Sequence, residues 1–289
     1  MSGHLHERVL AWYDDHARVL PWREPSASAW AVMVSEFMLQ RTPVARVLPV
    51  FEQWMQMWPT PADLAAASTG DAIRAWGRLG YPRRALRLHH AATAIVAEHD
   101  GEVPTSHEAL RALPGVGDYT AAAVASFAFG QRHVVLDTNV RRVFARAASG
   151  VGFPSRSVTR AERELATGLL PDDDATAASW AVAVMELGAL VCTAASPKCD
   201  DCPVDDLCAW RAAGYPAYDG PPRRGQTYAG TDRQCRGRLL GVLRDTPEPV
   251  HRSRLDVVWS NQEQRTRCLI SLLDDGLVAR LSDDTYALP

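Results

Sequence analysis

The chain has 289 residues, of which 47% are hydrophobic and 22% charged, an ordinary balance for a globular protein of two or three domains. No apolar run approaches 18 residues and the first residues are polar, so we expect no signal peptide, no membrane span and a cytoplasmic location. The net charge of −3 argues weakly against a nucleic-acid partner, but a segregated basic face can bind phosphate despite a negative total. Arginines do cluster, at Arg83, Arg84 and Arg87; at Arg141, Arg142 and Arg146; and at Arg223 and Arg224.

Hydrophobic periodicity and turn residues predict an all-α chain. The expected helices lie within residues 2–24, 30–40, 43–58, 62–67, 69–76, 83–99, 105–112, 120–129, 134–149, 150–170 and 177–191. A stretch rich in Gly, Pro and Arg, residues 211–232, reads as a linker. Three more helical patterns (234–244, 252–259 and 263–274) and a hairpin pattern over 276–288 follow, and together they resemble a small winged-helix unit.

A glutamate lies inside the strongly apolar helix predicted over residues 30–40. Val32, Met33 and Phe37 make the packing stripe of this helix, and Glu36 sits among them. A carboxyl group in such surroundings should lose water, which raises its pKa and keeps it protonated near neutral pH, as a general acid requires. The alternative is a glutamate on the solvent face of an amphipathic helix, the usual position of this residue.

The segment Leu113-Pro-Gly-Val-Gly117 breaks the helical pattern between two helices. Its glycines permit a tight turn, and the following helix begins with unpaired backbone N–H groups at its positive end. Such a helix start is a ready anion site, and the glycines let a phosphate approach closely. The alternative is a Gly-rich turn in an ordinary helical protein.

Four cysteines fall within 17 residues near the end of the predicted helical region. Cys192, Cys199, Cys202 and Cys208 form the pattern Cys-x6-Cys-x2-Cys-x5-Cys. In a reducing compartment this pattern indicates a metal site rather than disulfides, and both zinc and a [4Fe–4S] cluster take four cysteines. Zinc sites more often pair two Cys-x2-Cys knuckles, so the asymmetric spacing favours the cluster.

These motifs together resemble the helix-hairpin-helix DNA glycosylases, over roughly residues 9–210. The hairpin is followed about 20 residues later by Asp137, and the cysteine spacing resembles that of the endonuclease III and adenine glycosylase branches. Residues 35–40, Ser-Glu-Phe-Met-Leu-Gln, and residues 18–22, Arg-Val-Leu-Pro-Trp, resemble signatures of the adenine glycosylases. On their own, Trp22 reads as a core aromatic and Asp137 as a helix cap.

The resemblance implies two helical lobes with DNA in the cleft between them. It places a six-helix lobe at 25–133, a discontinuous iron–sulfur lobe at 1–24 plus 134–212, a linker at 213–232 and a winged-helix-like domain at 233–289. The implied partner is double-stranded DNA with a mismatched adenine, bound by a monomer in the nucleoid, away from any membrane.

The resemblance also implies a role for each matching residue. Glu36 would protonate N7 of a flipped adenine, and Asp137 would stabilise the oxocarbenium ion with support from Tyr119 and Asn139. The base pocket would be lined by Arg18, Leu20 and Trp22. DNA would be contacted by Gln40, Arg41, Gly80, Tyr81, Gly115, Val116 and Gly117.

Four departures from the family pattern qualify this reading. Arg41 replaces a glutamine that inserts into the DNA stack, and Val182 stands where many members have Gln or Glu. Tyr119 replaces the lysine of the strand-cleaving members, so we expect a glycosylase without a strong lyase step. The chain also looks too short for the larger C-terminal domain that recognises 8-oxoguanine in better-known adenine glycosylases.

Two rival functions stay open at this point. A thymine- or uracil-mismatch glycosylase of the same fold can also carry tyrosine at the lysine position. A non-catalytic DNA-binding protein could use the hairpin, the metal cluster and the winged helix for binding alone, but it would need neither Glu36 nor Asp137.

Overall fold

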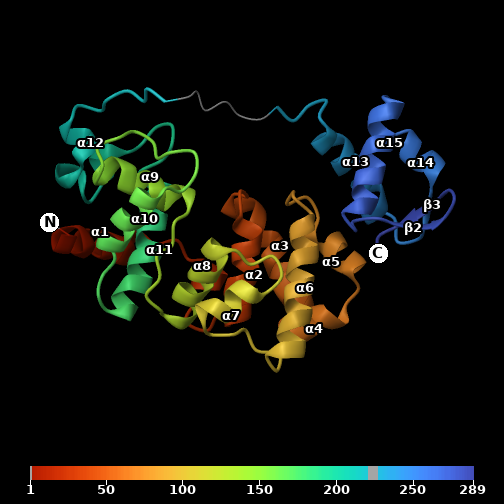
Figure 1. Cartoon of the computed structure of the whole chain (residues 1–289), viewed down its shortest axis with the longest axis horizontal. Helices are drawn as coiled ribbons and strands as arrows, with labels where there is room; N and C mark the ends of the chain where they lie inside the picture. Colours follow the sequence, from red (N-terminus) through yellow and green to blue (C-terminus); the bar gives the residue numbers. More distant parts are fainter. Residues whose placement is uncertain (1, 221–226) are drawn as a thin grey trace. The chain divides into compact units, whose positions relative to one another are not determined.

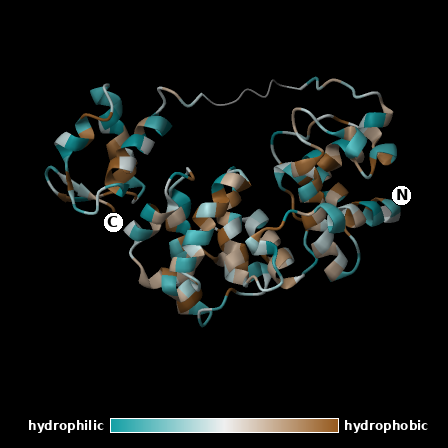
Figure 2. Ribbon diagram, turned by 180° about the vertical axis from the view of Figure 1, so that it is seen from behind, coloured by the Kyte–Doolittle hydropathy of each residue, from teal (hydrophilic) through white to brown (hydrophobic). Residues whose placement is uncertain are grey.

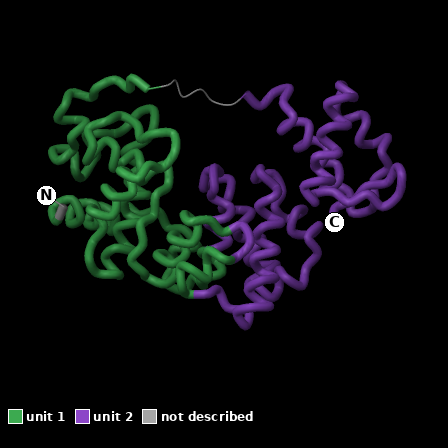
Figure 3. Tube along the Cα trace, viewed as in Figure 1, with its two compact units in different colours: residues 1–32, 105–112, 116–222 green, residues 33–104, 113–115, 223–289 purple. Residues whose placement is uncertain are grey.

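The structure is a computed structural model that describes residues 2–220 and 227–289. Two compact units are distinguished by their internal contacts (Figure 3). Unit 1 contains residues 1–32, 105–112 and 116–222, and unit 2 contains residues 33–104, 113–115 and 223–289. The domain boundaries that the resemblance implies stay a prediction.

Unit 1 is helical and has its core on one long apolar helix, α11 (Asp174–Leu190). Trp180, Val184 and Leu187 of α11 are fully buried, and the N-terminal helix α1 (Ser2–His16) and α9 (Thr138–Ala147) pack against them. The other elements of unit 1 are η1 (Pro21–Arg23), α7 (His107–Ala112), α8 (Asp118–Phe129), α10 (Arg160–Gly168), η2 (Cys199–Asp201), η3 (Asp205–Leu207) and α12 (Ala209–Ala212).

Unit 2 contains the helices that follow α2 (Ala29–Leu39), which begins in unit 1 and continues into unit 2. These helices are α3 (Val44–Met57), α4 (Pro61–Ala66), α5 (Thr69–Trp76) and α6 (Arg83–Glu98). The Trp54 ring meets Trp58 and Trp76 edge-on, with centroids 4.6 and 5.6 Å apart. Teal and brown residues mix along many helices in Figure 2, as expected for helices that bury one face.

The C-terminal module, residues 227–289, has the element order of a winged helix (Figure 1). Antiparallel pairing gives the strand order β1-β3-β2. The predicted hairpin is therefore present, and an additional two-residue strand, β1, precedes it. The elements are α13 (Asp232–Arg244), β1 (Val250–His251), α14 (Arg252–Asp256), α15 (Gln262–Asp274), β2 (Ala279–Ser282) and β3 (Thr285–Ala287).

The predicted helices are present, with small differences at their ends. The hairpin helix α8 begins at Asp118, two residues earlier than expected, and ends at Gly130, whose φ of 65° makes a left-handed cap. α12 extends into the start of the predicted linker, and residues 221–226 of that linker, which include Arg223 and Arg224, lie outside the described residues. In the described part of the chain, every helix is too short or too polar to span a bilayer.

Candidate active site and nucleic-acid interface

The turn between α7 and α8 requires glycine at one of its two glycine positions. Gly115 has φ of +78°, and a Cβ built there would lie 2.6 Å from the Cβ of Arg87. Gly117 has an ordinary φ of −101° and open space around it, and it precedes α8 without a side-chain cap. Val116 between them is buried. The sequence therefore predicted the turn correctly, and the structure shows that Gly115 is required for the backbone and Gly117 leaves the helix start open.

We expect Gly115→Ala to destabilise the fold by about 1–3 kcal/mol, because it adds left-handed strain and a clash with Arg87. Gly117→Ala is the matched control, and its free energy of unfolding should change by less than about 0.5 kcal/mol. Urea denaturation of both variants measures the difference. Equal losses in the two variants would contradict this assignment.

Glu36 is buried in α2, as its sequence context predicted. The residue is 4% exposed, and Ser35, Phe37, Met33 and Met38 around it have no measurable exposure. A carboxyl group in this position is separated from bulk water, so its protonated form is favoured over the ion. Glu36 therefore has the environment that a general acid needs, whereas a glutamate on a solvent face would not.

A buried arginine that the sequence reading assigned to a phosphate-binding cluster holds two loops of unit 2 together. Arg84 is 5% exposed, and its guanidinium donates to the carbonyl oxygens of Phe37, Met38 and Gln40 at 2.8, 3.3 and 2.6 Å. It also donates to the Thr42 hydroxyl and the Gly80 carbonyl, both at 3.2 Å. Burial lowers the pKa of Arg84 to about 10, so it remains charged at neutral pH.

These bonds position the residues that were predicted to enter DNA. Gln40 and Arg41 follow α2, and Gly80 and Tyr81 precede α6. Arg41 and Tyr81 both have left-handed backbones, with φ of 57° and 49°, which is uncommon for residues other than glycine. The Arg41 side chain is exposed and Tyr81 is 43% exposed. The structure thus brings the two predicted loops together, with strained residues at both tips.

Arg84→Lys should loosen both loops, because a single ammonium group cannot reach acceptors in five directions. We expect a loss of about 2 kcal/mol in the free energy of unfolding and faster amide exchange over residues 38–42 and 78–81. Hydrogen-exchange mass spectrometry measures the local effect. Arg83→Lys, at the exposed neighbouring position, is the control, and slow exchange in both variants would rule out a role for Arg84 in holding the loops.

Asp137 caps helix α9 and is bonded through both of its oxygens. One oxygen accepts from the backbone N–H groups of Asn139 and Val140 at 2.8 and 2.7 Å, and the other accepts from the Asn139 side chain at 2.7 Å. Burial raises the pKa of this carboxyl group above its ordinary value, although the three hydrogen bonds and Arg142 act to lower it. Asp137 is therefore a cap and also a partly desolvated carboxyl group held in one orientation.

Tyr119 lies in the first turn of α8 and packs against a small apolar cluster in unit 1. That cluster contains Ala122, Ala123, Val135 and Ala181. Because Val135 is two residues before Asp137, the cluster brings the start of α8 close to the segment that carries the candidate carboxylate. Asn139 is fixed in a different way: a Cβ added to Gly188 of α11 would lie 2.8 Å from its Cβ.

The predicted base-pocket segment is held by an acidic residue that the sequence analysis missed. Glu186 of α11 has no measurable exposure and accepts from Arg18 Nε and Nη2 at 2.7 and 2.6 Å and from Arg23 Nη2 at 2.9 Å. These bonds lower the pKa of Glu186 to about 2 despite its burial. Leu20 and Trp22 between the two arginines are buried. Glu186 is one helical turn after Val182, where an acidic or amide side chain had been sought.

The arginine cluster of α9 does not form the basic face that the sequence suggested. Arg141, Arg142 and Arg146 are all buried. Arg141 pairs with Glu162 at 2.9 Å, and the other two donate mainly to backbone carbonyls, among them the carbonyl oxygens of Gly188, Cys192 and Thr193. The reason is that the loop before the cysteines leaves its carbonyls without helical partners, and guanidinium groups satisfy them.

The four cysteines lie on one short segment, in and around η2 and η3. Burial and the nearby thiols of Cys192, Cys208 and Cys199 raise the pKa of Cys202 to about 12, so the four sulfur atoms lie near one another. Arg146 donates to Cys192 Sγ at 3.4 Å, as suits a thiolate. Within the described residues, no three Cys, His, Asp or Glu side chains are close enough to hold a single metal ion. The donor set and the charged neighbour fit a sulfur-ligated group.

Comparison with known proteins adds three findings. Residues 34–167 match the family described as HhH-GPD superfamily base excision DNA repair protein. An adenine DNA glycosylase of Mycobacterium tuberculosis is 57% identical over 97% of this chain and 92% of that protein, and the human adenine DNA glycosylase is 45% identical over 70% of this chain and 38% of that protein. The structure of a thermostable thymine-DNA glycosylase aligns with a TM-score of 0.65 and 25% identity over 73% of this chain and 97% of that one.

Proposed function

Since the chain belongs to the adenine DNA glycosylases of the HhH-GPD superfamily, we propose that it removes adenine paired with 8-oxoguanine or guanine from double-stranded DNA. The observation that carries the proposal is the burial of Glu36 within α2. A buried carboxylic acid can protonate a purine that is brought to it, and a protein that only binds DNA does not need one.

The proposed reaction begins with a flipped adenine in a pocket lined by Leu20, Trp22 and Arg18, the last held in place by Glu186. Glu36 gives its proton to N7. The bond between N9 and C1′ then breaks, and its electron pair leaves with adenine. This leaves a positive charge on the sugar at C1′ and O4′.

Asp137 supplies the negative charge for the second half of the reaction. Its oxygens are already oriented by Asn139 and Val140, so no reorganisation is needed when charge develops on the sugar. Water adds to C1′ and loses a proton, which gives the abasic site. Tyr119, in place of a lysine, offers no amine for a Schiff base, so the strand stays intact.

DNA contacts would come from the hairpin and the two loops held by Arg84. The open start of α8 after Gly117 offers backbone N–H groups to a phosphate. Arg41 and Tyr81 occupy the loop tips, where a wedge into the base stack would have to be. We further propose that the protein acts as a monomer on chromosomal DNA in the cytoplasm.

The test is adenine release from duplexes carrying A opposite 8-oxoguanine, G or C, with T and U opposite G as the rival substrates. Alkali-dependent cleavage at A supports the proposal. Cleavage at T or U would instead support the mismatch glycosylase that the thymine-DNA glycosylase structure brings to mind. Nicking without alkali, with a product trapped by borohydride, would contradict the monofunctional assignment, and no cleavage of any duplex would favour a binding protein.

We also propose that Cys192, Cys199, Cys202 and Cys208 hold a [4Fe–4S] cluster, which would fix the segment around η2 and η3. We expect about four irons and four sulfides per chain by metal and acid-labile sulfide analysis. Cys202→Ala should lose most of this iron, and Cys235→Ala, at a buried cysteine of the C-terminal module, should keep it. One zinc per chain, or iron retained without Cys202, would contradict the assignment.

A further inference from the structure

The C-terminal module is docked on helices α5 and α6 of the same unit. Ile73 of α5 and Leu86 of α6 belong to the hydrophobic core of the module. Asp275, after α15, accepts from Arg83 of α6 at 3.3 Å and from Arg236 of α13 at 2.5 Å. A methyl group on Gly70 of α5 would overlap the carbonyl oxygen of Pro289. The module therefore packs closely beside the loop that connects these two helices.

This packing brings the first turn of α13 to the loop tips described above. The hydroxyl group of Tyr81 is hydrogen-bonded to the guanidinium groups of Arg41 and Arg233, and these two cations lower the pKa of the phenol. Arg233 is the second residue of α13 and lies with its guanidinium 5.2 Å from the ring centroid of Tyr228. Tyr81 thus connects a loop of the glycosylase fold to the C-terminal module.

Positive charge gathers around this contact. Arg244, at the other end of α13, is close enough to Arg78 that the repulsion, together with burial, lowers its pKa. Arg46 donates to the carbonyl oxygen of Arg78 and so keeps the loop close to α3. Cations from the two loops and from α13 therefore lie on the same side of unit 2, a charge distribution that suits the phosphates of a DNA strand.

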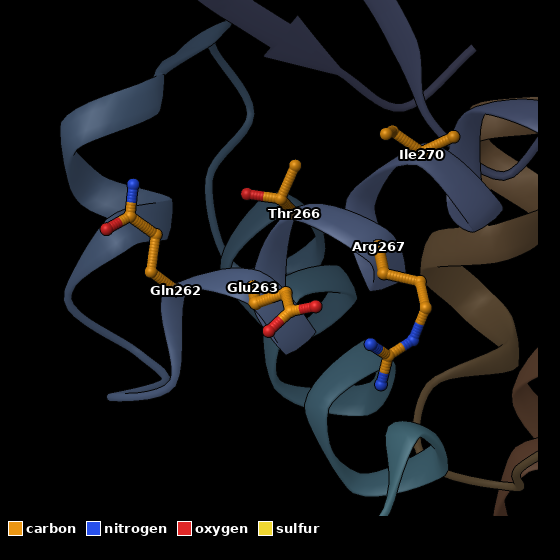
Figure 4. A pocket seen from close by; sticks show the side chains of 5 residues that line it. All are labelled: Gln262, Glu263, Thr266, Arg267 and Ile270. Atoms are coloured by element: carbon orange, nitrogen blue, oxygen red, sulfur yellow. The ribbon is translucent and has the colours of Figure 1, made fainter.

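The exposed face of α15, the helix that reads DNA in many winged-helix proteins, has a different character. Its surface pocket is lined by the side chains labelled in Figure 4, which include Glu263, Arg267 and Ile270. Arg267 points toward α13, where it pairs with Asp232 at 2.9 Å. Because its arginine is neutralised and its other groups are mixed, this face offers little to phosphate, and the contribution of the module lies on α13.

We propose that Arg233 is a positioning residue for reading the base opposite the excised adenine, and that it acts by holding the Tyr81 side chain together with Arg41. The inference rests on the proposed function, which places Tyr81 in the DNA groove. In this arrangement the small C-terminal module supports opposite-base discrimination through an existing loop of the glycosylase fold.

The test compares single-turnover adenine release opposite 8-oxoguanine and opposite C. We expect Arg233→Ala to lower the ratio of the two rates about tenfold, because one charged hydrogen bond to Tyr81 is lost. Arg233→Lys should recover part of the ratio. Arg238→Ala is the matched control, since Arg238 lies on the same helix but packs on Trp259 within the module, and its ratio should stay within about twofold of the wild type.

A double-mutant cycle with Tyr81→Phe separates positioning from a direct DNA contact. If Arg233 acts through the hydroxyl group, Arg233→Ala should not lower the ratio further in the Tyr81→Phe background. An equal loss in both backgrounds, or a uniform loss on every duplex, would overturn the proposal. Failure of the wild-type protein to release any adenine would instead overturn the proposed function. The phenol of Tyr81, titrated as the difference between wild type and Tyr81→Phe without DNA, should have a higher pKa in Arg233→Ala.

Discussion

Replacing Glu36 with glutamine is expected to slow adenine release by about 10²–10⁴-fold. The side chain is 4% exposed and has almost the same shape as glutamine, so the fold around α2 should be preserved. Glutamine has no proton of comparable acidity, and adenine would have to leave without protonation at N7. Single-turnover release from a duplex with A opposite 8-oxoguanine measures the loss.

Two controls separate chemistry from binding and folding. Glu52→Gln changes an exposed glutamate of α3 and should leave the rate within about twofold. The affinity of Glu36→Gln for the same duplex should match that of the wild type, since the proton matters only when the glycosidic bond breaks. A Glu36→Gln protein that still releases adenine at the wild-type rate would show that Glu36 is a structural residue.

Glu186→Gln is expected to destabilise the protein at neutral pH by about 3 kcal/mol. The folded pKa of about 2 lies below the ordinary value of 4.5, and this difference corresponds to about that free energy. Because the folded pKa is depressed, the contribution is fully present above pH 4.5 and is lost as the pH falls toward 2. The affected contacts are the pairs with Arg18 and Arg23.

The measurement is the free energy of unfolding of both proteins between pH 7 and pH 3. The gap between wild type and Glu186→Gln should be constant above pH 5 and narrow below pH 4.5. Glu164→Gln, at an exposed pair with Arg160, should show a gap of less than about 1 kcal/mol. A gap for Glu186→Gln that does not depend on pH would mean that its ion pairs are not the source of the stability.

The sequence predicted the backbone of the site better than its buried charges. The turn at Gly115, the burial of Glu36 and the cap at Asp137 depend on local chemistry, and short-range patterns are enough to find them. The burial of Arg84 and Glu186 depends on acceptors and donors far along the chain, from Phe37 in one case and Arg18 in the other. No local pattern distinguishes such an arginine from one that faces solvent.

The same difference explains the missing strand and the misread basic cluster. Strand β1 has two residues, and only its pairing with β3 makes it a strand. The arginines of α9 looked like a phosphate site because adjacent cations usually lie at a surface. Their true partners are carbonyl groups 46 to 48 residues away, which become accessible only when α11 and the following loop are in place.

The arginines of α9 also show that the segment matching the superfamily is not an independent folding fragment. Residues 34–167 contain α9 but lack both α1 and α11, which surround it in the hydrophobic core of unit 1. In a protein trimmed to those residues, Arg142 and Arg146 would lose the carbonyl partners that lie between residues 188 and 194. Any dissection, domain graft or split-enzyme design should therefore keep the N-terminal helix and the cysteine segment on the same polypeptide as α9.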